Sequence, residues 1–271
     1  MRIDFIKMHG LGNDFVVLDG RAQSLPAMTG RLAAALADRK TGIGCDQLIL
    51  VEPSDVADMS MRIFNADGGE VEACGNATRA VGLLHGEAAS IETLGGILTT
   101  SLGDGGVAVD MGEPRFGWDE IPLDCAMDTL RMPTGWEELV EPTAVNVGNP
   151  HVIFFVDDCD EVDLERLGPL IEHDPLFPNR VNVNVATVTA RDAIRLRVWE
   201  RGVGETRACG TGACATAIAA MRRGLTERNV TVTLTGGPLA IEWGADNRIT
   251  MTGDAAESFR GSFELSDYGA A

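Results

Sequence analysis

MRIFNADGGEVEACGNATRA, residues 61–80, and LRVWERGVGETRACGTGACA, residues 196–215, are the two stretches that decide the fold, because they align without a gap. Their spacing of 135 residues (209 minus 74) is about half of the 271-residue chain. The sequence therefore predicts two copies of one module, each with a cysteine followed by glycine at the same point. The shared pairs are Arg62/Arg197, Gly69/Gly204, Glu70/Glu205, Ala73/Ala208, Cys74/Cys209, Gly75/Gly210 and Ala80/Ala215.

The repetition continues on both sides of the cysteines. A Gly-Asn pair precedes an apolar run at residues 12–13 and again at 148–149, and Gln47 and Asn182 each begin another such run. A Gly-Gly pair interrupts strand-like sequence at residues 95–96 and again at 236–237. Because these matches keep one order and a nearly constant offset, we interpret them as an internal duplication of one domain.

Short alternating or β-branched runs predict strands in both halves, for example at residues 59–65, 195–200 and 230–234. One helix is predicted directly after each Cys-Gly, and two more precede them in their modules. The expected fold is α+β, with two pseudo-symmetric domains at residues 1–117 and 118–257. A strand-like piece at 258–265 is expected to return to the first domain, and the stretch 114–143 reads as the linker. The four predicted helices cover residues 30–38, 76–87, 164–172 and 211–224.

Composition excludes several classes of function. A formal net charge of −19 would repel phosphate backbones and anionic membranes, so neither nucleic acid nor a membrane is an expected partner. No apolar run is long enough to span a bilayer. Six cysteines without a compact framework spacing fit a reducing cytoplasm. No nucleotide-binding glycine motif is present.

The same reading predicts neither a cofactor nor a metal. Lysine occurs only as Lys7 and Lys40, and neither lies in a glycine-rich phosphate loop that would suit pyridoxal phosphate. Cys209 and Cys214 are close in sequence, but they lack the further ligands of a zinc site. We interpret Cys45, Cys125, Cys159 and Cys214 as packing residues.

Cys74 and Cys209 are better explained as reactive residues than as packing residues. Free amide groups and the dipole at a helix start stabilise an anion, so they favour a thiolate and can bind a substrate carboxylate. Two such thiols suit a reaction that inverts a carbon atom next to a carboxylate. One thiolate would remove the proton and the other sulfur would return a proton to the opposite face, without a cofactor.

Six segments together resemble the motif set of the diaminopimelate epimerase family. The resemblance implies two similar domains of strands wrapped around a central helix. It also implies interconversion of LL- and meso-diaminopimelate, on the route to lysine and peptidoglycan, by a homodimer that needs no pyridoxal phosphate. The segments are MHGLGNDF (8–15), TGIGCDQ (41–47), FNADGGEVEACGN (64–76), NVGNPH (146–151), FPNRVNVN (177–184) and WERGVGETRACGTGACA (199–215).

The resemblance assigns roles to individual residues. Cys74 and Cys209 are the expected acid and base, while His151 and Glu200 are expected to modulate their pKa values. Arg201 would grip a carboxylate of the substrate in forked geometry. The full expected set of substrate contacts is Asn13, Gln47, Asn65, Gly75, Asn76, Asn149, Asn182, Glu200, Arg201, Gly210 and Thr211.

Three other functions fit part of the pattern. A related racemase could use the same thiols on another amino acid. The residues suited to the distal group of the substrate favour diaminopimelate, and they are Asn65, Asn149, Asn182 and Arg201. A thiol redox protein lacks its usual C-x-x-C arrangement here. An amino-acid-binding protein would not require two cysteines at helix starts.

Overall fold

The computed structural model describes residues 1–71, 74–103 and 105–268 and divides the chain into two compact units. Unit 1 comprises Met1–Val109 and Gly253–Ala271, and unit 2 comprises Asp110–Thr252. The sequence predicts boundaries after residues 117 and 257, which is later in the chain than the observed boundaries after Val109 and Thr252. Two predicted features, Ala73 of the repeat and the last three residues of 258–271, lie outside the described residues.

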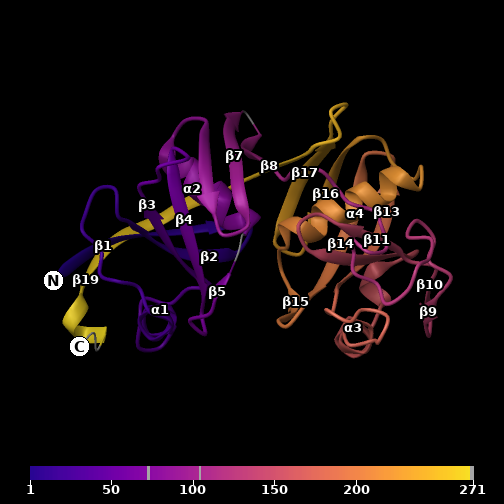
Figure 1. Ribbon diagram of the computed structural model, residues 1–271, viewed down its shortest axis with the longest axis horizontal. Coiled ribbons are helices and arrows are strands. Elements are labelled where there is room, and N and C mark those ends of the chain that lie inside the picture. Colours follow the sequence, from indigo (N-terminus) through magenta and orange to yellow (C-terminus); the bar gives the residue numbers. More distant parts are fainter. Residues whose placement is uncertain (72–73, 104, 269–271) are drawn as a thin grey trace. The chain divides into compact units, whose positions relative to one another are not determined.

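Unit 1 consists of strands with two α-helices and a short 3₁₀ turn (Figure 1). Helix α1 spans Gly30–Ala37, helix α2 spans Gly75–His85, and the turn η2 spans Leu265–Tyr268. The strands are β1 (Arg2–Gly10), β2 (Asn13–Asp19), β3 (Gln47–Glu52), β4 (Met59–Asn65), β5 (Glu70–Val71), β6 (Ala89–Thr93), β7 (Gly96–Gly103), β8 (Gly106–Asp110) and β19 (Ala256–Glu264).

Unit 2 is composed in the same way. Helix α3 spans Leu164–Glu172, helix α4 spans Gly210–Arg222, and the turn η1 spans Cys159–Glu161. The strands are β9 (Gly135–Trp136), β10 (Leu139–Val140), β11 (Thr143–Asn146), β12 (Pro150–Phe155), β13 (Asn182–Ala190), β14 (Ala193–Glu200), β15 (Gly204–Thr206), β16 (Asn229–Leu234), β17 (Gly237–Trp243) and β18 (Ile249–Gly253).

Strand pairing repeats from one unit to the other. In unit 1, β1 is antiparallel to β2, β2 is parallel to β3, and β3 is antiparallel to β4. Strand β4 then pairs with β5 antiparallel and with β6 parallel, and β6 pairs with β7. Strands β11 to β17 of unit 2 follow the same sequence of partners and directions. The predicted duplication is therefore present at the level of topology.

The register repeats as well. Phe15 lies opposite Gln47 in unit 1, and His151 lies opposite Asn182 in unit 2, at the offsets found in the sequence. A hydrogen-bonded ion pair also recurs on the equivalent strands. Arg62 donates to Glu70 at 2.7 Å, and Arg197 donates to Glu205 at 2.8 Å. A feature shared this closely supports a common origin for the two modules.

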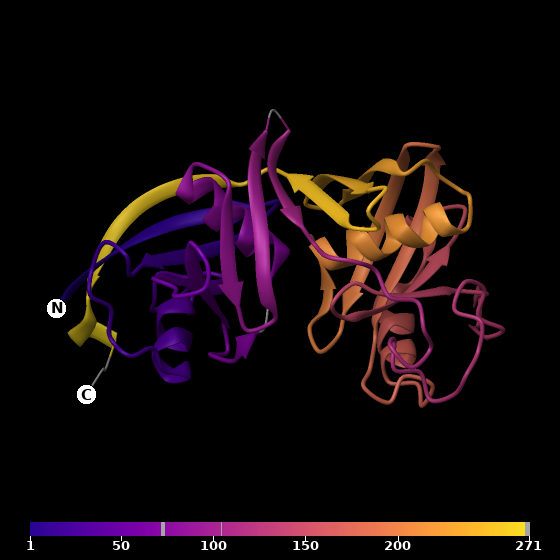
Figure 2. The ribbon, with the colours of Figure 1, turned by 45° about the horizontal axis from the view of Figure 1, so that its top comes forward.

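Each unit is built around the helix that follows its Cys-Gly (Figure 2). Helix α2 packs against β1, β6, β7 and β19, and α4 packs against β11–β14, β16 and β17. Residues Gly212–Ala220 of α4 are all buried, which is expected for a helix whose small apolar residues occupy every face. The fold is therefore α+β, with strands wrapped around one central helix in each unit.

The segment expected to be a linker belongs to the core of unit 2, so that expectation was wrong. Ile121, Leu123, Met132 and Leu139 are each at most 4% exposed and join the core formed with α3 and β12. Trp136 stacks on Phe177 and donates from Nε1 to Asp174. The surrounding prolines and acidic residues concealed these isolated apolar anchors in the sequence.

The last strand pairs with the first strand of unit 1. Strand β19 pairs antiparallel with β1 from Arg2–Glu264 to His9–Ala256, and the two strands run side by side in Figure 1. Among the described residues, no helix has the length and apolar character needed to cross a membrane.

Gly168 of α3 tests the packing of unit 2. A Cβ atom there would lie 2.4 Å from Cδ2 of Trp199, whose indole nitrogen is held by Glu172. We expect Gly168→Ala to lower the free energy of unfolding by about 1–3 kcal/mol, measured by urea denaturation. Helix propensity alone would predict that the substitution raises the free energy of unfolding by up to about 1 kcal/mol.

Leu170 provides the matched control on the same helix, because its side chain is 54% exposed. We expect Leu170→Ala to change the free energy of unfolding by about 0.5 kcal/mol or less. A stabilising Gly168→Ala substitution would contradict the described contact with Trp199.

Candidate active site

The two central helices begin in the same way. Cys74 and Cys209 occupy the N-cap positions of α2 and α4 in extended conformation, with φ and ψ of −147° and 114° and of −136° and 108°. Gly75 and Gly210 form the first residues of the helices and are buried. Each thiol therefore lies beside the free amide groups of a helix start, as the sequence predicts.

In unit 1, Cys74 lies at one side of a directed chain of amides. Its sulfur is 4.0 Å from Oδ1 of Asn13, which also accepts from Nδ2 of Asn76 at 3.3 Å. Nδ2 of Asn13 donates to Asp46 at 3.1 Å, and Oδ1 of Asn76 accepts from Arg79 at 2.8 Å. A carboxylate can only accept and a guanidinium can only donate, so the two ends fix the orientation of both amides.

Two basic residues hold the carboxylate end of this chain. Arg39 donates to Asp46 at 2.7 Å and also pairs with Asp14, which is bonded to Lys7. Although burial alone would raise it, hydrogen bonds from Arg39 and Lys7 lower the pKa of Asp14 far below its ordinary value. This charged group therefore anchors the loop beside Asn13 rather than facing a reaction.

Two further predicted contacts lie opposite each other on neighbouring strands of unit 1. Gln47 begins β3 and Asn65 ends β4, and Nε2 of Gln47 donates to Oδ1 of Asn65 at 3.0 Å. Oε1 of Gln47 is buried and has no hydrogen-bond partner among the described residues. An acceptor left open in this way suits an ammonium group of a ligand.

In unit 2, Cys209 lies within a group of polar side chains. Its sulfur accepts from the amide of Gly212 at 3.3 Å and lies 3.5 Å from the hydroxyl of Thr211. Burial, and after it the negative charge of Glu200, raise the pKa of the Cys209 thiol well above its ordinary value. Burial also raises the pKa of Glu200, whose carboxylate accepts from Thr206. Cys209 is therefore a protonated thiol in this state.

His151 connects to the same group through amides. Its Nε2 lies 3.0 Å from Oδ1 of Asn149, and Nδ2 of Asn149 donates to the hydroxyl of Thr211 at 3.3 Å. Its Nδ1 lies 3.2 Å from Nδ2 of Asn184. Burial lowers the pKa of His151 to about 3, so the ring is neutral at ordinary pH.

Asn182 and Arg201 are also brought together. Nδ2 of Asn182 donates to the carbonyl of Pro150 at 2.8 Å, and its Oδ1 accepts from the backbone amide of Arg201 at 2.9 Å. The guanidinium of Arg201 is exposed and donates to the carbonyl of Asn179. Within the described part of the chain its other donors have no hydrogen-bond partner, so they remain available in the fork that carboxylates bind.

The duplicated frameworks present different chemistry at equivalent positions. Phe15 occupies in unit 1 the register position of His151, and Asn65 occupies that of Glu200. At these two positions unit 1 therefore has a phenyl ring and a neutral amide, and unit 2 has an imidazole and a carboxyl group.

Sequence reasoning missed three residues of these groups. Asp46 and Arg79 end the amide chain in unit 1, and the fully buried Asn184 contacts His151 in unit 2. The alternation in NVNV was the available indication for Asn184, because it places Asn182 and Asn184 on one face of β13. Arg79 was visible only as a lone charge in an otherwise uncharged helix.

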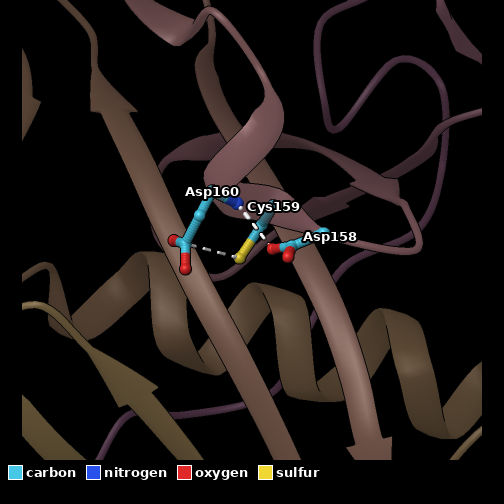
Figure 3. A group of neighbouring side chains, drawn as sticks. All are labelled: Asp158, Cys159 and Asp160. Atoms are coloured by element: carbon cyan, nitrogen blue, oxygen red, sulfur yellow. Dashed lines mark hydrogen bonds between the residues drawn. The ribbon is translucent and has the colours of Figure 1, made fainter.

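The remaining cysteines lie elsewhere. Burial raises the pKa of Cys45 to about 11, which makes its thiol unreactive. In residues 1–71, 74–103 and 105–268, Asp158, Cys159 and Asp160 are the group with the spacing of a metal site (Figure 3). Arg195 pairs with both carboxylates, however, so their oxygens already have a cationic partner.

Comparison with known proteins assigns this arrangement to a family. The model of the diaminopimelate epimerase family matches residues 5–117 and 143–257. The chain belongs to the diaminopimelate epimerase family. A diaminopimelate epimerase of Erythrobacter litoralis is 70% identical over 268 residues, covering 99% of this chain and 100% of that protein. One of Rhizorhabdus wittichii is 64% identical, covering 100% and 98%.

Solved structures with much lower identity share the fold. A phenazine biosynthesis protein of the PhzF family from Enterococcus faecalis aligns with a TM-score of 0.72 at 16% identity, covering 97% of this chain and 100% of that one. A probable proline racemase from Agrobacterium radiobacter, solved with bound carbonate, aligns with a TM-score of 0.68 at 17% identity, covering 99% and 94%. These similarities confirm the predicted fold class.

The lowered pKa of His151 predicts an acid-sensitive stability. Above pH 6.5 the ring is neutral in both states, but between pH 6.5 and about 3 only the unfolded chain takes up the proton. This group should therefore cost about 1.4 kcal/mol of stability for each pH unit below 6.5. We expect His151→Gln to flatten that part of the pH dependence in urea unfolding between pH 7 and 4.

His173, which is exposed, supplies the control. The slope of stability against pH is measured in parallel for His173→Gln, which removes an exposed imidazole instead of a buried one. An equal slope in the His151→Gln variant would show that His151 accepts a proton in the folded state.

Proposed function

We propose that this protein interconverts LL- and meso-2,6-diaminopimelate, with Cys74 and Cys209 as the two acid–base groups. The observation behind the proposal is the duplicated helix start, which presents one thiol beside free backbone amides in each unit. Membership of the family provides the substrate. In this assignment unit 1 is the half with Cys74 and unit 2 is the half with Cys209.

The reaction begins with the substrate carboxylate. The amides of Gly75, Asn76, Gly210 and Thr211 would bind it, and their hydrogen bonds strengthen as negative charge builds on its oxygens. Removal of the α-proton becomes feasible because this charge is met by donors that are already in place.

Proton transfer then inverts the carbon. One sulfur takes the α-proton as a thiolate, and the other, as a thiol, gives its proton to the opposite face. One proton leaves the carbon and one arrives, so the enzyme ends with thiol and thiolate exchanged. Burial and the charge of Glu200 raise the pKa of Cys209, so this sulfur is a thiol and a proton donor in the substrate-free enzyme.

Neighbouring groups adjust the second thiol. The charge of Glu200 opposes ionisation of Cys209, while Thr211 and the amide of Gly212 favour it. His151 is neutral, so its contribution is a hydrogen bond rather than a proton. Neighbours that both oppose and favour ionisation suit a thiol that must act as an acid in one direction and as a base in the other.

The distal part of the substrate needs its own recognition. The open acceptor of Gln47, together with Asn65, is suited to an ammonium group, and the guanidinium of Arg201 is suited to a carboxylate. Asn13, Asn149 and Asn182 supply further neutral donors and acceptors. This set distinguishes diaminopimelate from a shorter amino acid, which would leave these groups unpaired.

The lysines support a mechanism without pyridoxal phosphate. Lys7 is bonded to Asp14 and to the carbonyl of Gly44, and Lys40 is exposed near the end of α1. We further propose a cytoplasmic homodimer in the biosynthesis of lysine and peptidoglycan precursors, as for the family.

Substitution of the thiols tests the proposal. We expect Cys74→Ala and Cys209→Ala each to lower kcat for epimerisation of LL-diaminopimelate by about 10²–10⁴-fold, which is the usual contribution of a positioned acid or base. Turnover is measured by chromatographic separation of the two isomers.

Cys214 provides the matched control, because it is a buried cysteine of the same helix as Cys209. We expect Cys214→Ala to retain kcat within about threefold, since this thiol faces the protein core and takes no part in proton transfer. Near-normal turnover in either of the other two variants would contradict the two-base proposal.

A further inference from the structure

Asn184 forms the far end of a hydrogen-bonded path to Cys209. The path runs from Asn184 to His151, then to Asn149, Thr211 and the sulfur, with successive distances of 3.2, 3.0, 3.3 and 3.5 Å. All five residues belong to unit 2. Asn184 is not among the residues for which the sequence predicts a role in the site.

Two directions of this path are possible, because a neutral imidazole has one N–H and one acceptor. If Nδ1 accepts from Asn184, then Nε2–H donates to Asn149, Asn149 donates to Thr211, and the Thr211 hydroxyl donates to the sulfur. If Nδ1 carries the hydrogen, every bond reverses, and the sulfur must donate to Thr211. The tautomer of His151 thus decides whether the path favours the thiolate or the thiol.

Asn184 favours the first direction. Its Nδ2 faces the carbonyl of Gly212 at 3.3 Å, and this oxygen can only accept. Nδ2 is also 3.2 Å from the hydroxyl of Thr216 and is closer to Nδ1 of His151 than Oδ1 is, at 3.2 Å against 3.4 Å. Nδ2 has two hydrogens for these three neighbours, so Nδ1 of His151 receives one of them when the Thr216 hydroxyl does not.

The equivalent position in unit 1 is occupied by a residue that cannot do this. The offset of 135 residues between the halves pairs Asn184 with Ile49, and Phe15 replaces His151 there. Both are fully buried apolar side chains. Unit 2, which contains Glu200, therefore has a polar pair of side chains where unit 1 has an apolar pair.

We propose that Asn184 is a positioning residue that holds His151 as the Nε2–H tautomer, so that the hydroxyl hydrogen of Thr211 is directed at the Cys209 sulfur. This hydrogen bond, with that from the amide of Gly212, stabilises the thiolate formed when Cys209 gives up its proton. It offsets the charge of Glu200, which opposes that thiolate. The inference rests on the proposed function for its catalytic consequence, but the tautomer is a property of the substrate-free protein.

The direct test is ¹⁵N NMR of the histidine rings in the full-length, substrate-free protein between pH 6 and 9. His151 is identified by the loss of its signals in the His151→Gln variant. We expect a protonated-type shift at Nε2 and an unprotonated-type shift at Nδ1. A protonated Nδ1 in the unchanged protein overturns the proposal, whatever the variants show.

Asn184→Asp tests the cause. The carboxylate introduced at position 184 can only accept, and imidazole is the more basic partner, so the ring hydrogen should move to Nδ1. We expect kcat for epimerisation to fall about tenfold while KM changes less than about twofold. An unprotonated Nδ1 in this variant, or an unchanged kcat with the hydrogen moved, contradicts the proposal.

Thr216→Val is the matched control. It removes another partner of Asn184 in the same buried region but leaves the carbonyl of Gly212 and the path to Cys209 in place. We expect the Nε2–H tautomer and a kcat within about twofold of the unchanged protein. A tautomer change in this control would show that general repacking, not Asn184, sets the ring. If the unchanged protein has the expected tautomer but does not turn over diaminopimelate, the proposed function fails and the positioning of His151 stands.

Discussion

The start of a buried helix immediately after a cysteine is the constraint on which the rest of the structure depends. The first amides of α2 and α4 have no partner within their helix and point outward beside Cys74 and Cys209. Burial of the helices within their sheets fixes these amides in place and keeps their field strong. Glycine directly after each cysteine leaves the amides open to a ligand.

Duplication explains both what the two sites share and how they differ. Equivalent strand pairings and the repeated Arg–Glu ion pair give each thiol the same backbone frame. The side chains around that frame have diverged, with Asn65 against Glu200 and Phe15 against His151. A shared frame suits two sulfurs that perform the same operation, and divergent neighbours suit two sulfurs that begin in different protonation states.

Much of the architecture could be predicted from the sequence. Alternation located β4 and the internal duplication located α3, both at their observed bounds. The pair of Cys-Gly motifs indicated the helix starts to within one residue. The end of α2 was predicted two residues too late, because Gly86 adopts φ of 87° and stops the helix at His85.

The chemical partners of the site were less visible. Asn184 contacts His151, which lies 33 residues earlier in the chain, and no local pattern reports such a contact. The polarity of a hydrogen-bonded chain depends on which atoms face each other across strands. Sequence motifs identify the members of such a chain, whereas its direction follows only from three-dimensional geometry.

Proton NMR of LL-diaminopimelate with the reduced protein in heavy water, without added cofactor, tests the central claim most directly. Two-base inversion predicts that the first meso product contains deuterium at the inverted carbon, while the remaining LL substrate still contains its α-proton. Meso product that retains the original proton, or exchange of the LL substrate ahead of inversion, would contradict the assignment of two sulfurs to opposite faces of one carbon.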